Sequence, residues 1–168
     1  VLARGRSRIA VIMGETWRVG DNRFYEGIRL GMSEAGLPAD GLRVVSLPPD
    51  RNAIKRYVSS CLAEADGPTA FISKPGRVGS DLWVPQVIAD AVAEAGLQVP
   101  RDISVVYHLD RDRSSGQFPV FPCTYRTWTW VQTFDCVADL LAAAMHDGPD
   151  APREHVLLPV AMYEPTSA

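Results

Sequence analysis

The stretch that decides the fold of this chain is Val99-Pro100-Arg101-Asp102-Ile103-Ser104-Val105-Val106-Tyr107-His108-Leu109-Asp110. A proline-containing turn leads into a short, mostly apolar run without strict alternation, and this run ends in a polar segment. Such a run is typical of a strand buried on both faces, as in parallel sheets. Ligands of open α/β sheets bind beyond the carboxyl ends of the strands. We therefore expect a binding site to begin near Tyr107.

Before this strand, apolar runs alternate with segments of helical periodicity. The expected strands are residues 8–13, 42–47 and 69–73, and the expected helices are residues 21–35, 54–65 and 82–95. Asp21 is expected to cap the first helix and Ser80 or Asp81 the third, while Gly36 and Gly96 follow two of them as stop signals. The alternation predicts an α/β fold, a doubly wound parallel sheet with helices on both faces.

The pattern changes after Asp110. A connection rich in charge, serine and proline leads to residues 123–126, which are followed by a long helix. The apolar positions of that helix share one face: Trp130, Phe134, Val137, Leu141, Ala144 and Met145. A last strand is expected at residues 156–160, with the tail beginning at Tyr163.

Composition limits the function classes. The chain has 168 residues, of which 46% are hydrophobic and 22% charged, and this suits one globular domain of ordinary core size. A formal net charge of −3 gives no electrostatic footprint for nucleic acid. No apolar run has the length of a membrane span. The three cysteines (Cys61, Cys123 and Cys136) lack metal-ligand spacing, so we expect no metal, no cofactor and small buried thiols in a cytoplasmic protein.

Six segments, in order along the chain, carry a resemblance to a known family. They are residues 8–12, 23–37, 67–71, 93–106, 124–126 and 156–159. In them the chain resembles the C-terminal half of a LacI/GalR-family transcription regulator. The resemblance implies a periplasmic-binding-protein-like effector domain with two lobes and a ligand cleft between them. Residues 1–168 would form mostly the C-terminal lobe, with about 123–148 crossing to the other lobe, and the DNA-binding domain is absent from this chain.

The resemblance also indicates where ligand contacts would lie. Sugar-binding members have an arginine where this chain has Phe24, with Arg23 beside it, and an asparagine-aspartate pair near Pro75. Their aspartate after the fourth strand corresponds to Leu109, with His108 before it and Asp110 after it, and their glutamine corresponds to Thr127 or Trp128. All four polar contacts differ, so hydrogen-bonded sugar recognition of the usual kind is not expected.

Aromatic side chains replace those polar contacts. In the functional interpretation, rings stack on a sugar or aromatic effector while Arg23 and Asp110 supply charge. In the structural alternative, Phe24 and Trp130 are core residues, Trp17 and Trp83 cover loops, and His108 bonds to backbone. The candidate ligand-binding set is Trp17, Arg23, Phe24, Pro75, Trp83, His108, Leu109, Asp110, Thr127 and Trp128.

Together these features predict the effector-sensing domain of a LacI-type regulator, which binds a small molecule such as a sugar or a sugar-like compound to control DNA binding. DNA would be contacted only through a helix-turn-helix outside this chain, and family dimers would meet at residues 82–95 and near Phe118. No membrane partner is expected. A catalytic role is not expected either, because no Gly-x-Ser-x-Gly elbow or paired acid and base occurs. The alternative is a solute-binding protein of a transport system with the same fold.

Overall fold

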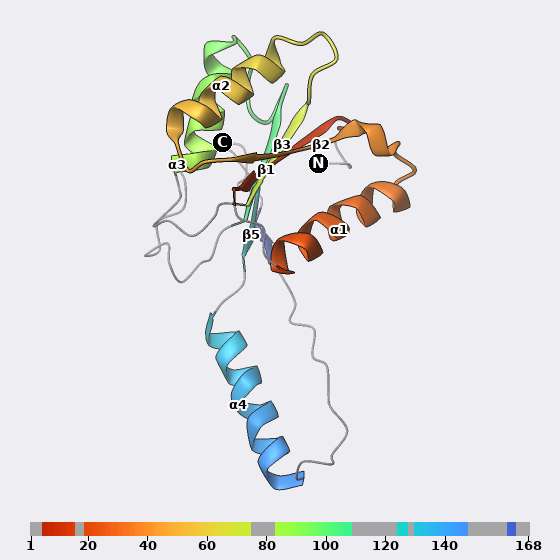
Figure 1. Cartoon of the computed structure of the whole chain (residues 1–168), viewed down its shortest axis with the longest axis vertical. Helices are drawn as coiled ribbons and strands as arrows, with labels where there is room; N and C mark the ends of the chain where they lie inside the picture. The colour runs from red at the N-terminus through yellow and green to blue at the C-terminus, as the bar shows by residue number, and fades with distance from the viewer. Residues whose placement is uncertain are drawn as a thin grey trace.

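A computed structural model describes residues 5–15, 19–74, 83–108, 124–127, 130–147 and 161–163 (Figure 1). Of residues 19, 74, 108, 124–127, 130–133, 144 and 161–163 it describes the backbone alone. The elements, in chain order, are β1 (Ile9–Gly14), α1 (Val19–Glu34), the 3₁₀ helix η2 (Ala39–Gly41), β2 (Leu42–Leu47), α2 (Arg51–Leu62), β3 (Ala70–Lys74), α3 (Trp83–Glu94), β4 (Ser104–His108), β5 (Thr124–Thr127), α4 (Trp130–Asp147) and β6 (Ala161–Tyr163).

These strands form one sheet in the order β2-β1-β3-β4-β5-β6. All neighbouring pairs from β2 to β5 are parallel, and β6 joins β5 antiparallel. The predicted doubly wound parallel sheet is therefore confirmed. One boundary was wrong: the tail was expected to begin at Tyr163, but Tyr163 pairs with Tyr125 in β6. The apolar run that begins at Val156 continues past Pro159 to Tyr163, whereas the expected strand ended at residue 160. The strand expected at 156–160 lies outside the described residues.

The helices cover both faces of the sheet, as predicted. Figure 1 shows α1 against one face and α2 with α3 against the other. This follows from right-handed crossovers, because the chain moves from β1 to β2 in one direction and from β2 across to β3 and β4 in the other. The larger core cluster, under α2 and α3, contains the fully buried Phe71, Ile88 and Tyr107. A smaller cluster under α1 contains Val11 and Met32.

Local signals account for most helix ends. The Asp50 side chain caps α2 by accepting a hydrogen bond of 2.6 Å from the Ala53 amide. Gly36 and Gly96 adopt φ angles of 68° and 73°, which confirms both as stops. The expected cap at Asp21 was wrong: α1 begins at Val19, and the Asp21 carboxylate lies in its first turn, where it faces the positive end of the helix dipole. The caps expected at Ser80 or Asp81 lie outside the described residues.

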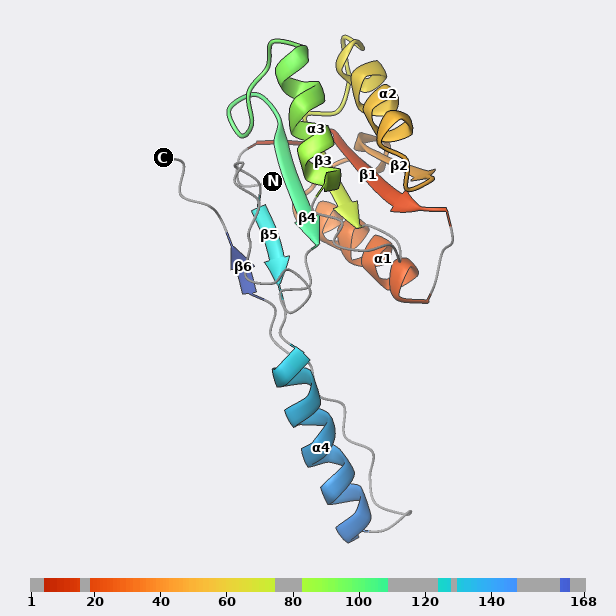
Figure 2. The same cartoon turned by 90° about the vertical axis from the view of Figure 1, so that its left-hand side faces the viewer.

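Helix α4 extends away from the sheet, as two perpendicular views show (Figures 1 and 2). Its predicted apolar face exists but is exposed: Phe134 is 63% accessible, Leu141 59% and Met145 86%. Periodicity therefore predicted this face correctly for the residues whose side chains are described. The side chain of Trp130 is outside them.

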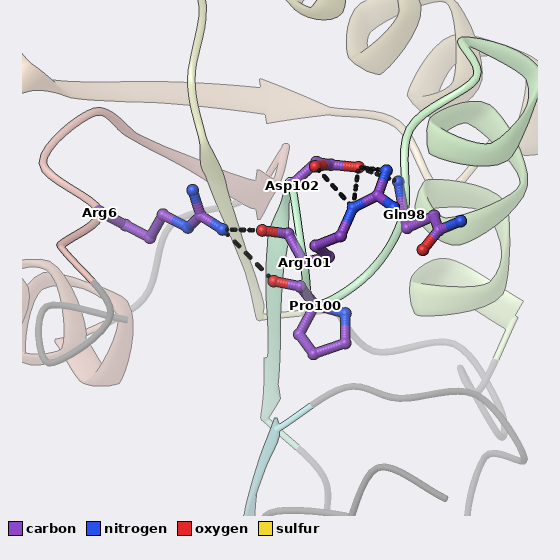
Figure 3. A network of polar contacts seen from close by, with 5 residues as sticks. All are labelled: Arg6, Gln98, Pro100, Arg101 and Asp102. Carbon is purple, nitrogen blue, oxygen red and sulfur yellow. Dashed lines mark hydrogen bonds and ion pairs between the residues drawn. The ribbon is translucent and has the colours of Figure 1, made fainter.

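The turn before β4 is held by two arginines (Figure 3). The Arg6 Nη2 group donates to the main-chain carbonyls of Pro100 and Arg101. The Asp102 carboxylate accepts from the Gln98 amide at 2.9 Å and from the Arg101 guanidinium at 2.8 Å. The Arg101 bond, followed by the Gln98 bond, lowers the pKa of Asp102.

The cysteines are free thiols where they are described. Cys61 is buried, as predicted, and Cys136 is half-buried; Cys123 lies outside the described residues. Burial raises the pKa of the Cys61 thiol, with a smaller opposing effect from a hydrogen bond to Tyr57. Cys61 therefore behaves as a small core hydrophobe.

Candidate ligand-binding site

The carboxyl ends of the parallel strands meet at one edge of the sheet. The register pairs Met13 with Lys74 and Ser73 with Tyr107, so β1, β3 and β4 end side by side. Helices α1, α2 and α3 begin just beyond this edge, so their N-terminal amides and the positive ends of their dipoles face it. This is the edge at which open α/β sheets bind ligands, and it is the edge that the sequence predicted.

Two predicted residues, Arg23 and Phe24, lie in the first half of α1. Arg23 is exposed. Phe24 is half-buried and packs against the core cluster under α1, together with Ile28. The packing of Phe24 favours the structural alternative, in which its ring supports the core.

Trp83 begins α3 and is half-buried against the larger core cluster. The guanidinium carbon of Arg51 lies 5.6 Å from the centre of its ring, which is cation-π range. Arg51 is the first residue of α2 and is exposed. Arg51 was not among the residues predicted from the sequence. The sequence shows that Arg51 follows the Pro-Pro-Asp break after β2, but it does not show that its side chain contacts a tryptophan 32 positions later.

His108 and Thr127 are the last residues of two neighbouring strands. His108 pairs with Arg126, so Thr127 follows one step along the same edge. Their backbones are therefore brought together as predicted, while their side chains are not described. The remaining candidates lie outside the described residues and stay predictions: Trp17, Pro75, Leu109, Asp110 and Trp128.

The described residues hold no group of three or more His, Cys, Asp or Glu side chains that could bind a metal ion. They do form a hollow of about 650 Å³ beside α1. It runs between that helix, η2 and the beginning of β2, which is the amino end of the strand. This groove is separate from the predicted edge and was not anticipated. Its lining includes Tyr25, Arg29, Leu30, Met32 and Leu42.

Comparison with known proteins places the chain in a family. Residues 1–167 match the family model described as the periplasmic binding protein-like domain. No curated protein matches the sequence.

Similar solved structures include several LacI-family regulators. A LacI family transcriptional regulator from Bifidobacterium animalis superposes with a TM-score of 0.71 at 17% identity, covering 97% of this chain and 55% of that one. A LacI-family regulatory protein from Chloroflexus aggregans gives 0.69 at 19%, covering 96% and 55%. A LacI family transcriptional regulator from Enterococcus faecium, solved with bound ribose, gives 0.65 at 18%, covering 97% and 56%.

The chain spans about half the length of these solved structures. None of the helices in the described ranges is both long and apolar enough to cross a membrane.

Proposed function

The chain belongs to the periplasmic binding protein-like domain family, and on that premise we propose that it is the effector-sensing part of a LacI-type transcription regulator. A small molecule binds at the carboxyl edge of the sheet, and its binding controls contact with DNA elsewhere in the full-length protein. The protein is a sensor without a reaction to catalyse. Ligand affinity differs between two arrangements of the protein, and the ligand shifts their populations.

One observation carries this proposal. The ends of β1, β3, β4 and β5 and the beginnings of α1, α2 and α3 converge on a single edge. Arg23 lies in the first half of α1, Trp83 begins α3, and His108 and Thr127 end β4 and β5. A small-molecule site combines a few polar groups with apolar walls in this way.

The exposed face of α4 is an argument for a second lobe, which would lie on the other side of that edge. This exposed apolar face includes Phe134, Leu141 and Met145, and contiguous apolar patches of this kind mark surfaces that pack against another body. In the proposal, residues of about 123–148 cross to a second lobe, and α4 packs there. The ligand is then enclosed between the two lobes, and DNA is contacted by a helix-turn-helix beyond this chain.

The proposal extends to assembly. Two copies of the regulator pair through the region of α3, with the segment near Phe118 contributing, so that ligand binding changes how the two copies are arranged.

The test is a ligand screen on the full-length protein. Thermal unfolding is measured against sugars, sugar acids, sugar phosphates and nucleosides, and each hit is then tested for its effect on DNA binding. A ligand at 100 times its Kd stabilises the folded state by about 2.7 kcal/mol. The proposal predicts at least one such ligand that also changes DNA affinity. Ligand binding without any DNA binding would point to a transport-type binding protein, and absence of both would overturn the proposal.

A further inference from the structure

The strongest unassigned feature of the molecule is the contact between Arg51 and Trp83, which joins the beginnings of α2 and α3. The two helices pack side by side on one face of the sheet (Figure 2). Both begin at the carboxyl edge, so the pair lies on the edge where the proposed effector binds. The inference below rests on that proposed function and concerns the chemistry of the ligand.

Among the described residues, Arg51 differs from two nearby cations in having no carboxylate partner. Its neighbours on the same side of the sheet are paired: Lys55 with Glu94 at 2.6 Å, and Arg43 with Glu64. No ion pair joins Arg51 to a carboxylate among the described residues. The adjacent Asp50 carboxylate accepts from the Ala53 amide within its own helix turn.

The geometry of the pair suits an anion. Trp83 is anchored in the larger core cluster, so its indole is a fixed platform. A guanidinium stacked on such a ring keeps the N–H groups of its planar edge for other partners, and that fork matches the two oxygens of a carboxylate or phosphate. Arg51 is the first residue of α2, where the Asp50 carboxylate caps the Ala53 amide, so the preference for an anion comes from the Arg51 fork itself.

We propose that Arg51, held against Trp83, is the anion-recognition subsite of the effector site, and that the effector carries a carboxylate or a phosphate. A sugar acid or a sugar phosphate has the required chemistry. Arg51 is then a specificity-determining residue that separates charged effectors from their neutral parents.

The test uses isothermal titration calorimetry on the full-length protein with four matched probes: D-glucose, D-gluconate, D-glucose 6-phosphate and inorganic phosphate. The variants are Arg51→Gln, Arg51→Lys, which keeps the charge but not the fork, and Arg56→Gln, an exposed arginine of the same helix, as the matched control. Folding of each variant is checked by its circular dichroism melting curve.

The expected result is that a charged probe binds at least tenfold more tightly than D-glucose. Arg51→Gln removes this preference, Arg51→Lys removes part of it, and Arg56→Gln leaves it within twofold. The better of the gluconate and phosphate arms identifies the anion. Equal affinity for neutral and charged probes, or equal effects of the Arg51 and Arg56 variants, would overturn the inference.

The two proposals fail differently. If neutral ligands bind and alter DNA affinity without any dependence on Arg51, only the anion subsite is wrong. If neither these probes nor any member of the wider screen binds, the effector-sensing function itself is wrong, and the anion subsite with it.

Discussion

Arg6 is bonded to the main chain of Arg101, 95 residues later in the sequence. The same guanidinium also donates to the Pro100 carbonyl, so one side chain fixes the turn before β4 to the segment before β1 (Figure 3). β3 lies between those two strands in the sheet. The contact therefore ties together two segments that enter the sheet on either side of a third strand.

Replacing Arg6 tests this tie. Arg6→Ala leaves two carbonyls without their charged donor, and we expect it to lower the free energy of unfolding by about 1–2 kcal/mol. Arg6→Lys, which reaches only one carbonyl at a time, loses less. Urea denaturation measures both, with Arg56→Ala as the control on an exposed arginine. A loss for Arg6→Ala no larger than for Arg56→Ala would show that the contact contributes nothing.

The Asp102 carboxylate makes the same turn sensitive to acid. Its pKa is lowered from the ordinary value of 3.8, first by the Arg101 bond and then by the Gln98 amide. A depressed pKa in the folded state stabilises the fold above the ordinary pKa, and this contribution is lost as the pH falls through the folded-state value. We expect Asp102→Asn to lower the melting temperature at pH 7, and we expect its difference from the wild type to shrink as the pH falls below 3.8.

The control for this pH dependence is Asp139→Asn, at an exposed position of α4. Its melting temperature should follow the wild type across the same pH range. A difference between Asp102→Asn and the wild type that stays constant as the pH falls below 3.8 would argue against the charge as its cause.

Two glycines should respond in opposite directions to alanine. A Cβ on Gly67 would lie 2.1 Å from the Cys61 carbonyl oxygen, which is backbone and cannot move aside. We expect Gly67→Ala to cost roughly 2–3 kcal/mol. A Cβ on Gly27, in the middle of α1, meets nothing within 4 Å, so Gly27→Ala should stabilise by about 0.5–1 kcal/mol. Chemical denaturation of the two variants gives the comparison directly.

The exposed face of α4 offers a test of its proposed burial. In the 168-residue chain, Leu141→Ala should change the free energy of unfolding by no more than about 0.5 kcal/mol, because Leu141 is 59% exposed. In the full-length protein the same substitution should cost roughly 2–5 kcal/mol if the residue packs in a second lobe. Asp135→Ala, on the same helix, is the control. Equal effects of Leu141→Ala in the two proteins would contradict the crossing of α4.

Local features of the fold were predictable because their signals are local. Gly36 and Gly96 marked two helix ends, and the unalternated apolar run around Val105 marked a strand buried on both faces. The position of α4 was not predictable, because helical periodicity shows which face of a helix is apolar but not which part of the protein packs against it. The start of α1 was missed because Asp21 is favourable in a first turn as well as at a cap.

The candidate site, like the fold, was predictable only in part. The edge itself followed from strand order, and Arg23, Phe24 and Trp83 lie beside it as expected. Phe24, however, packs into the core. The spacing of apolar residues alone could not distinguish this core position from a ligand contact. Arg51 was missed because its importance comes from the Trp83 ring, and residues 32 apart share no pattern in the sequence.

The place of β1 in the sheet has a consequence for the chain as it leaves the ribosome. Among the described strands, β1 precedes both of its neighbours, β2 and β3, and all three are complete by Lys74. A nascent chain that has reached Lys74 therefore holds three adjacent strands of the sheet. The later strands β4 and β5 each add to a growing side of this nucleus. Folding can therefore follow the direction of translation, because neither β1 nor β2 has a neighbour in the sheet that is synthesised after β3.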